Sequence, residues 1–179
     1  MMGFLFALLG SAIVGIGARD QALVASLTLR QGARPAVLAL ALLLAWASAA
    51  AAAWAGAQFA PQLTPPVRTM LVALVLGVAA LELLLVRPLK EPAEPTESLF
   101  AFGAVLLAQQ LTDAARLLVF ALAATTVLPA AAGLGGAIGC SFTVLGGWLA
   151  AAELDKWPVT ALRRALGLVL LGIALWLAI

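Results

Sequence analysis

Residues 14–21 have the sequence Val-Gly-Ile-Gly-Ala-Arg-Asp-Gln, and they interrupt an apolar run that extends from about Gly3 to Leu29. A similar interruption, Gln-Gln-Leu-Thr-Asp-Ala-Ala-Arg at residues 109–116, lies in the apolar run from Ser98 to about Thr125. A helix of about 20 apolar residues crosses the hydrocarbon core of a bilayer, and both runs are longer than that. The sequence therefore predicts two membrane-spanning helices with polar side chains at mid-depth.

The composition of the whole chain is that of an integral membrane protein. Of the 179 residues, 65% are hydrophobic and 10% are charged, with a mean hydropathy of +1.14. Because soluble domains carry about a quarter charged residues, a water-soluble fold is excluded. The chain has no histidine and one cysteine, Cys140, which excludes disulfide frameworks, Cys/His metal sites and Ser-His or Cys-His nucleophiles. We therefore expect a protein that is not an enzyme and that holds no cofactor.

Charges and prolines divide the rest of the chain into further spans. Arg87 to Glu97 is the clearly polar stretch, with three prolines and three glutamates, a composition typical of a solvated linker. Helices satisfy their own backbone groups in hydrocarbon, so we predict an all-α integral membrane protein. It has about six transmembrane helices, at about Gly3 to Leu29, Ala36 to Ala57, Val67 to Val86, Ser98 to Thr125, Pro129 to Ala152 and Pro158 to Ile179.

The two halves of the chain share one layout. Each has a long span with polar residues at mid-depth, then a span rich in small residues, then an aliphatic span after a loop with proline. Shifting the first half so that position 15 falls on position 110 also places Ala18 on Asp113. Three spans per half put the halves in opposite orientations, the plan of many transporters. We predict inverted three-helix repeats at residues 1–87 and 98–179, joined by a cytoplasmic Pro/Glu linker at residues 88–97.

Lysine and arginine gather on one side of the predicted bundle. The other side has only Arg68, whereas the loops after the first, third and fifth spans and the start of the sixth hold Arg30, Arg34, Arg87, Lys90, Lys156, Arg163 and Arg164. Loops rich in lysine and arginine stay cytoplasmic, so we expect both termini outside, in the bacterial inner (plasma) membrane. The net charge of +2 is too small and scattered to indicate a nucleic-acid partner. The lipid bilayer is the expected partner, and a homodimer is left open.

Four ionisable residues lie inside the predicted spans: Arg19, Asp20, Asp113 and Arg116. Each isolated charge at a helix centre costs about 2.5–3.5 kcal/mol, so we expect the acidic and basic residues to pair. The charges form either an ion site or a salt-bridge network that locks the two halves together, and the sequence leaves both open. Glu82, near the end of the third span, is predicted to extend toward water or to pair with Arg87, and a role as proton acceptor is left open. Nearby hydrogen-bonding groups are Gln21, Thr28, Gln109, Gln110 and Thr112.

Small residues recur in two of the predicted spans. Gly135, Gly139, Thr143 and Gly147 follow one another every four residues and form one smooth stripe on a helix. The alanine-rich run from residue 47 to residue 57 includes Ser48 and Gly56. Small residues let membrane helices approach closely, so both features predict packing surfaces.

The two polar segments resemble the signature motifs, E-x-G-D-K/R-S/T-Q, of the small Golgi-type calcium and manganese/proton exchangers, the uncharacterised-protein family 0016. Residues 135–149, with Thr-Val-Leu-Gly-Gly at 143–147, are similar to that family's G-H-x-x-x-S/T-x-x-A-V-x-G-G segment. The spans that begin at Pro65 and Pro158 are similar to the helix that closes each family repeat, so the resemblance covers nearly the whole chain. It implies exchange of Mn²⁺ or Ca²⁺ for protons, with the cation held between the two motif helices.

In the first motif, Gly17, Arg19 and Gln21 match the family pattern. The positions of the family's glutamate and aspartate are occupied by Gly15 and Ala18, and Asp20 stands where the family has serine or threonine. Two residues along a helix correspond to a rotation of about 200°, so Asp20 should face away from position 18 unless the chain kinks at its glycines.

In the second motif, Asp113 keeps the family's aspartate, while Gln110 stands at the glutamate position and Thr112 at the glycine position. The resemblance therefore implies a degenerate cation site made of Asp113, Gln110 and Asp20, whose oxygens suit hard cations. Its neighbours would be Arg19, Gln21, Thr112 and Arg116.

Three functions stay open on these residues. The first is divalent cation/proton antiport at the degenerate site, weak or altered in ion, with a small cation and protons as partners. The second is transport of another small substrate through the same scaffold. The third is a non-transporting or repurposed homologue whose intramembrane Arg/Asp pairs are structural. We predict the first of these functions, with the last as the alternative.

Overall fold

A computed structural model of the chain describes residues 2–86, 98–154, 156 and 158–179. These residues are helical, with no strand among them. Three of the long helices begin with proline at their first residue, where its missing N–H costs nothing. In chain order the elements are α1 (Met2–Val14), α2 (Arg19–Gln31), α3 (Pro35–Phe59), η1 (Ala60–Gln62), α4 (Pro65–Leu85), α5 (Leu99–Leu111), α6 (Ala114–Thr125), α7 (Pro129–Leu149), α8 (Ala151–Leu154) and α9 (Val159–Ala178).

Several of these helices are long and apolar enough to cross a membrane. In the part of the chain that the structure describes, α3 with η1, α4, α7 and α9 qualify singly, and the pairs α1–α2 and α5–α6 qualify as bent spans. The count is therefore four, or up to six if each bent pair is one span. They fall at the places of the six predicted spans, except that α7 ends at Leu149. The predicted linker at residues 88–97 lies outside the described residues.

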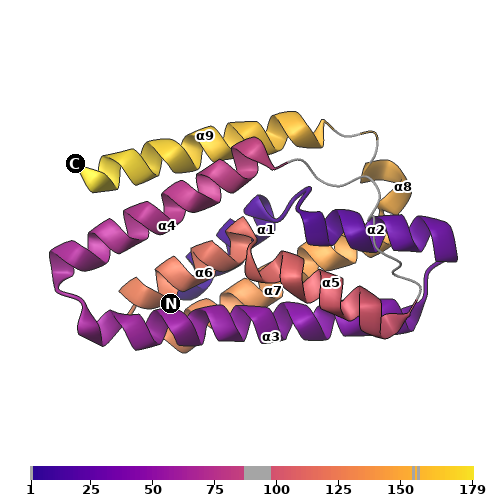
Figure 1. The fold of residues 1–179 in the computed structure, drawn as a ribbon, viewed down its shortest axis with the longest axis horizontal. Helices are drawn as coiled ribbons and strands as arrows, with labels where there is room; N and C mark the ends of the chain where they lie inside the picture. Colours follow the sequence, from indigo (N-terminus) through magenta and orange to yellow (C-terminus); the bar gives the residue numbers. More distant parts are fainter. Residues whose placement is uncertain (1, 87–97, 155, 157) are drawn as a thin grey trace.

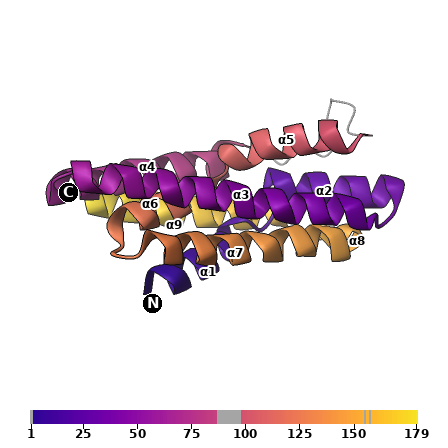
Figure 2. The same cartoon turned by 90° about the horizontal axis from the view of Figure 1, so that it is seen from below.

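The helices form an elongated bundle (Figure 1). α3 runs along its length, α4 and α9 pack side by side, and α1 packs against α7. The start of α1 and the end of α9 lie toward the same end of the bundle in both views (Figures 1 and 2).

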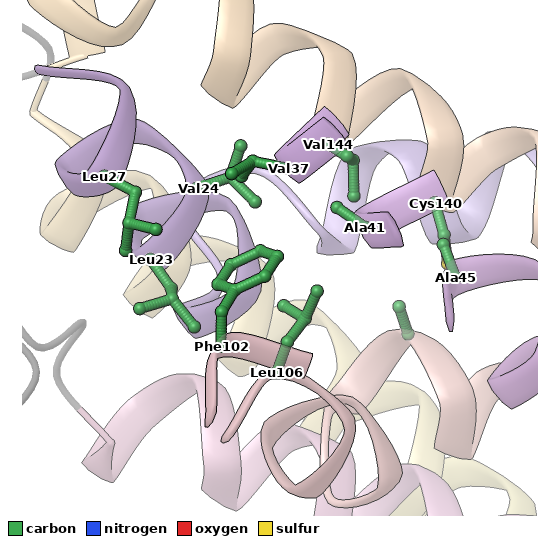
Figure 3. Close-up of a cluster of buried hydrophobic side chains, with 11 residues drawn as sticks. Leu23, Val24, Leu27, Val37, Ala41, Ala45, Phe102, Leu106, Cys140 and Val144 are labelled. Atoms are coloured by element: carbon green, nitrogen blue, oxygen red, sulfur yellow. The ribbon is translucent and has the colours of Figure 1, made fainter. Parts of the chain in front are cut away.

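A hydrophobic cluster ties the half of the bundle around α2 and α5 to α3 and α7 (Figure 3). Phe102 and Leu106 of α5 are fully buried there, in the same cluster as Leu23, Val24 and Leu27 of α2. The partners from α3 and α7 are small, among them Ala41, Ala45 and Cys140, so these helices approach closely. The cluster holds α2 and α5, one half of each bent span, in one packed unit.

The bends come from two short breaks in the helical backbone. α1 and α2 meet at 54° across residues 15–18, where Gly17 has a φ of +69°. α5 and α6 meet at 52° across Thr112 and Asp113, and Asp113 is extended. Backbone groups freed by a break need new partners inside a membrane. The Gly17 N–H donates to Oε1 of Gln21 at 2.6 Å, and the Thr112 carbonyl accepts from Nη2 of Arg19 at 3.4 Å.

The glycine stripe of α7 packs against both halves of the first bent span. A Cβ atom on Gly135 would collide with the carbonyl of Phe4, and one on Gly139 with the carbonyl of Leu8. Farther along the stripe, a Cβ on Gly147 would lie 2.7 Å from a carbonyl oxygen of α2. The predicted packing role is thus confirmed, because backbone meets backbone along the whole stripe. Gly56 of α3 meets α6 in the same way.

We expect Gly17→Ala to destabilise the fold through both conformation and contact. An L-residue in the left-handed region costs about 1–2 kcal/mol, and the new Cβ would also collide with Val159 of α9. Gly32→Ala is a matched control, because Gly32 has a φ of +79° but no atom within 4 Å of an added Cβ. Gly172→Ala, in open space within α9, should be neutral or slightly stabilising.

Thermal unfolding of the purified variants in detergent measures the effect. The melting temperature should fall most for Gly17→Ala and less for Gly32→Ala. Equal losses at positions 17 and 32 would contradict a steric role for the contact with α9.

Candidate functional site

The two helix breaks lie close together in the bundle interior. Asp20 is the second residue of α2 and Asp113 directly precedes α6, so each carboxylate lies at a helix N-terminus. The positive end of a helix favours a negative charge, which suits both positions. Both residues are buried, with exposed fractions of 2% and 4%.

Arg116, in the first turn of α6, bridges these two carboxylates. Its Nη1 donates to Oδ2 of Asp20 at 3.0 Å and to Oδ2 of Asp113 at 2.9 Å. The guanidinium is itself 3% exposed. Charged hydrogen bonds of this kind are about twice as strong as neutral ones. The expectation that the intramembrane acidic and basic residues pair is confirmed for these three residues.

Two neutral side chains complete the surroundings of the guanidinium. Nε of Arg116 donates to Oγ of Ser48, near the middle of α3, at 3.1 Å. The hydrogen-bonding groups around Gln110 fix the orientation of its side-chain amide, with the oxygen toward Arg116. In this orientation the amide oxygen accepts from Nη2 of Arg116 at 3.0 Å. The amide nitrogen then donates to the carbonyl of Leu44 at 3.1 Å. Each guanidinium nitrogen therefore has an oxygen partner.

A second charged cluster lies where α4, α9 and the start of α2 meet. Nη2 of Arg163 donates to Oε1 of Glu82 at 2.9 Å, and both side chains are buried. Nε of Arg19 is 3.9 Å from the same oxygen. Arg19 also donates to Oγ1 of Thr112 at 3.0 Å, so it joins this cluster to the second helix break.

Two expectations about these residues are corrected. Arg163 was expected among cytoplasmic surface charges, but it is 2% exposed because α9 packs against α4 and turns it inward. Glu82 was expected to extend toward water, but it is buried and pairs with Arg163. Its pairing with Arg87 and its role as a proton acceptor stay predictions. Arg87 itself lies outside the described residues.

The structure brings together most of the site residues expected from the sequence. Asp20, Asp113 and Gln110 all reach Arg116. In a continuous helix, Asp20 would face away from position 18. That geometry does not apply here, because α1 ends at residue 14 and α2 begins at residue 19. The side chain of Gln21 does not reach the carboxylates, although its backbone N–H donates to Oδ1 of Asp20 at 2.7 Å. Its amide caps the first break and donates to the carbonyl of Thr143 at 3.0 Å.

Ser48 is a site residue that the sequence did not predict, because it lies in an alanine-rich run whose composition indicates helix packing. A buried serine inside an alanine-rich span is itself a signal, since a hydroxyl in hydrocarbon needs a partner. Nothing in the sequence indicates which residue of the other half that partner is.

A cavity of about 160 Å³ adjoins the site between α3 and α6. Ser48 and Arg116 provide its polar wall, and neither Asp20 nor Asp113 lines it. The guanidinium thus stands between the cavity and the carboxylates. The remaining walls are apolar, made by Ala51, Ala52, Leu111, Leu117 and Phe120.

The charges of the site limit what it can bind as arranged. Across the described ranges, no group of three or more histidine, cysteine, aspartate or glutamate residues is placed to hold a metal ion. With both carboxylates ionised, Asp20, Asp113 and Arg116 together have a net charge of −1. Ca²⁺ takes six to eight oxygen ligands, most of its charge being balanced by carboxylates. A dication therefore competes here with the guanidinium.

The fold and the site together define a class: an all-helical protein with apolar helices that could span a membrane and with charged residues buried at its helix breaks. Comparisons of the chain with protein-family models, with curated proteins and with solved structures found no match. The resemblance to the exchangers stays a prediction from the sequence.

We expect the buried pair of Glu82 and Arg163 to show strong energetic coupling. Removing one partner of a buried ion pair costs about 3–5 kcal/mol, whereas replacing both with apolar residues is often neutral. Glu82→Leu and Arg163→Leu should therefore each destabilise strongly, and the double variant should recover most of the loss.

The matched control is the pair of Glu153 and Lys156, at 2.8 Å but 60% and 67% exposed. Glu153→Gln should change the free energy of unfolding by less than about 1 kcal/mol. Equilibrium unfolding of all variants in mixed micelles provides the comparison. Additive losses in the Glu82/Arg163 double variant would contradict the coupling.

Proposed function

We propose that this protein is a membrane transporter that exchanges a small cation for protons. The observation that carries the proposal is the meeting of Asp20 and Asp113, from two helix breaks, at one guanidinium in the bundle interior. Transporters commonly bind substrate and coupling ions at discontinuous helices near the bilayer midplane. Ionisable residues buried in membrane spans also mark ion pathways by default.

The arrangement of the helices supports an inverted repeat of residues 1–87 and 98–179. Each half has a bent pair, then a long helix that packs on its counterpart, α3 on α7, then a closing helix that does the same, α4 on α9. The contacts also exchange between halves, since α6 packs on α3 and α2 packs on α7. We propose the bacterial inner membrane as its location, with both termini outside, as the distribution of lysine and arginine indicates.

The net charge of the site narrows the choice of ion. With Arg116 in place, one proton or one monovalent cation neutralises Asp20 and Asp113. A divalent ion such as Mn²⁺ or Ca²⁺ binds only where Arg116 releases at least one of the carboxylates. Proton coupling fits this scheme because carboxylates take up protons as their counter-charge leaves.

A non-transporting scaffold is the second candidate, and one observation favours it. Arg116 pairs with both carboxylates and has oxygen partners on each nitrogen, which is the arrangement of a structural network. Glu82 and Arg163 add a further ion pair between α4 and α9. In this candidate the charges only hold the helices together.

Proton-driven uptake of Mn²⁺, Ca²⁺ and Na⁺ into proteoliposomes tests the proposal. We expect uptake above that of empty vesicles, and we expect Asp113→Asn and Asp20→Asn each to lower the initial rate about tenfold or more, because each removes a charge from the site. Glu153→Gln, which alters a carboxylate of an exposed ion pair, should transport normally.

Folding of each variant is checked by its elution as a single species and by a cooperative melt. Uptake by folded wild-type protein that does not exceed uptake by empty vesicles would contradict transport. The structural scaffold would then be the better assignment.

A further inference from the structure

The partners of Arg116 form a set of oxygen donors from four separate parts of the chain. Asp20 belongs to α2, Ser48 to α3 and Gln110 to α5, while Asp113 precedes α6. Their oxygens lie between 2.9 and 3.1 Å from nitrogens of the guanidinium. The guanidinium is thus a cation enclosed by two carboxylates, a hydroxyl and an amide oxygen.

These four oxygens are also the donor types that hard cations prefer. Carboxylate, hydroxyl and amide oxygens bind Ca²⁺ and Mn²⁺, whereas softer metals select nitrogen and sulfur. Without the guanidinium, the net charge of the site changes from −1 to −2, which is the charge of Asp20 and Asp113 alone. That charge matches one divalent cation.

We propose that Arg116 is a tethered cation that occupies a divalent-cation site, and that Mn²⁺ or Ca²⁺ binds to the same oxygens when the guanidinium is removed or turned away. The choice of ion rests on the proposed function, but the binding does not require transport. Ser48 is a ligand of this site that the family resemblance does not imply.

The cavity beside Arg116 gives the guanidinium a place to move to. It has a volume of about 160 Å³ and is bordered by small residues of α3, Ala51 and Ala52. Movement of one side chain therefore changes the site from filled to available.

The second charged cluster serves as an internal contrast. Arg163 shares the single carboxylate of Glu82 with Arg19. Removing Arg163 leaves one carboxylate beside one remaining guanidinium, which is no site for a dication. Arg163→Ala is therefore a matched control for the loss of a buried arginine.

The experiment measures binding of Mn²⁺ by electron paramagnetic resonance and of Ca²⁺ by calorimetry, with purified protein in detergent. Arg116→Ala should bind one divalent ion with a Kd of about 10⁻⁴ M, at least about tenfold tighter than wild type. Free guanidinium ion should compete with that binding, because it refills the same place. Arg163→Ala should show no gain.

A triple variant, Asp20→Asn with Asp113→Asn and Arg116→Ala, separates this site from surface binding, because it removes both carboxylates and should bind no divalent ion.

Arg116→Gln is a milder second variant that keeps a donor toward the carboxylates and adds an amide oxygen. If Arg116→Ala does not fold, binding of the divalent ion by Arg116→Gln tests the proposal instead. If both fold only in millimolar Ca²⁺, the proposal is supported, and if both stay unfolded in it, the proposal is wrong.

The outcomes distinguish this inference from the proposed function. Binding by Arg116→Ala together with no uptake by wild type means that the site exists but stays filled, so only transport is lost. Uptake by wild type with no binding gain in Arg116→Ala or Arg116→Gln means that the ion travels elsewhere, and the tethered-cation inference fails.

Discussion

Charge in a hydrocarbon environment must be neutralised from within the protein, and this requirement organises the bundle. In the described part of the chain, the two clusters contain three carboxylates (Asp20, Glu82 and Asp113) and three guanidiniums (Arg19, Arg116 and Arg163), whose charges sum to zero. Neither cluster is neutral by itself. The cluster around Arg116 has two carboxylates and one guanidinium, whereas the cluster around Glu82 has one carboxylate and two guanidiniums. Arg19 and Asp20 are neighbours in the chain, so the start of α2 joins the two clusters into one balanced unit.

The helix breaks depend on the same constraint applied to the backbone. A break in hydrocarbon frees N–H and carbonyl groups, and each must find another partner. Gln21 satisfies the Gly17 N–H at the first break, and Arg19 satisfies the carbonyl of Thr112 at the second. The residues next to one break therefore support the backbone of both, which is a physical reason for the two breaks to lie together.

The sequence predicted the spans but neither the breaks nor the ion-pair partners. Apolar runs bounded by proline located the long helices. The polar residues 14–21 and 109–116 were predicted to lie at mid-depth in continuous spans, and the structure has a bend at each of them. The small residues at 135, 139 and 147 predicted close packing correctly. In contrast, the contacts of Ser48 with Arg116 and of Arg163 with Glu82 depend on how helices far apart in the sequence are aligned against one another. Pairs more than 60 positions apart leave no local pattern, so a single sequence could not reveal them.

The balance of the buried charges has an electrical consequence. A unit whose charges sum to zero feels no net force from the transmembrane voltage when it moves as a whole. If Arg116 alone moves relative to Asp20 and Asp113, one positive charge is displaced, and the membrane voltage exerts a net force on it. A potential of 100 mV does work of about 2.3 kcal/mol on one elementary charge that crosses the full field. Membrane voltage should therefore act on the position of the Arg116 side chain and not on the balanced unit as a whole.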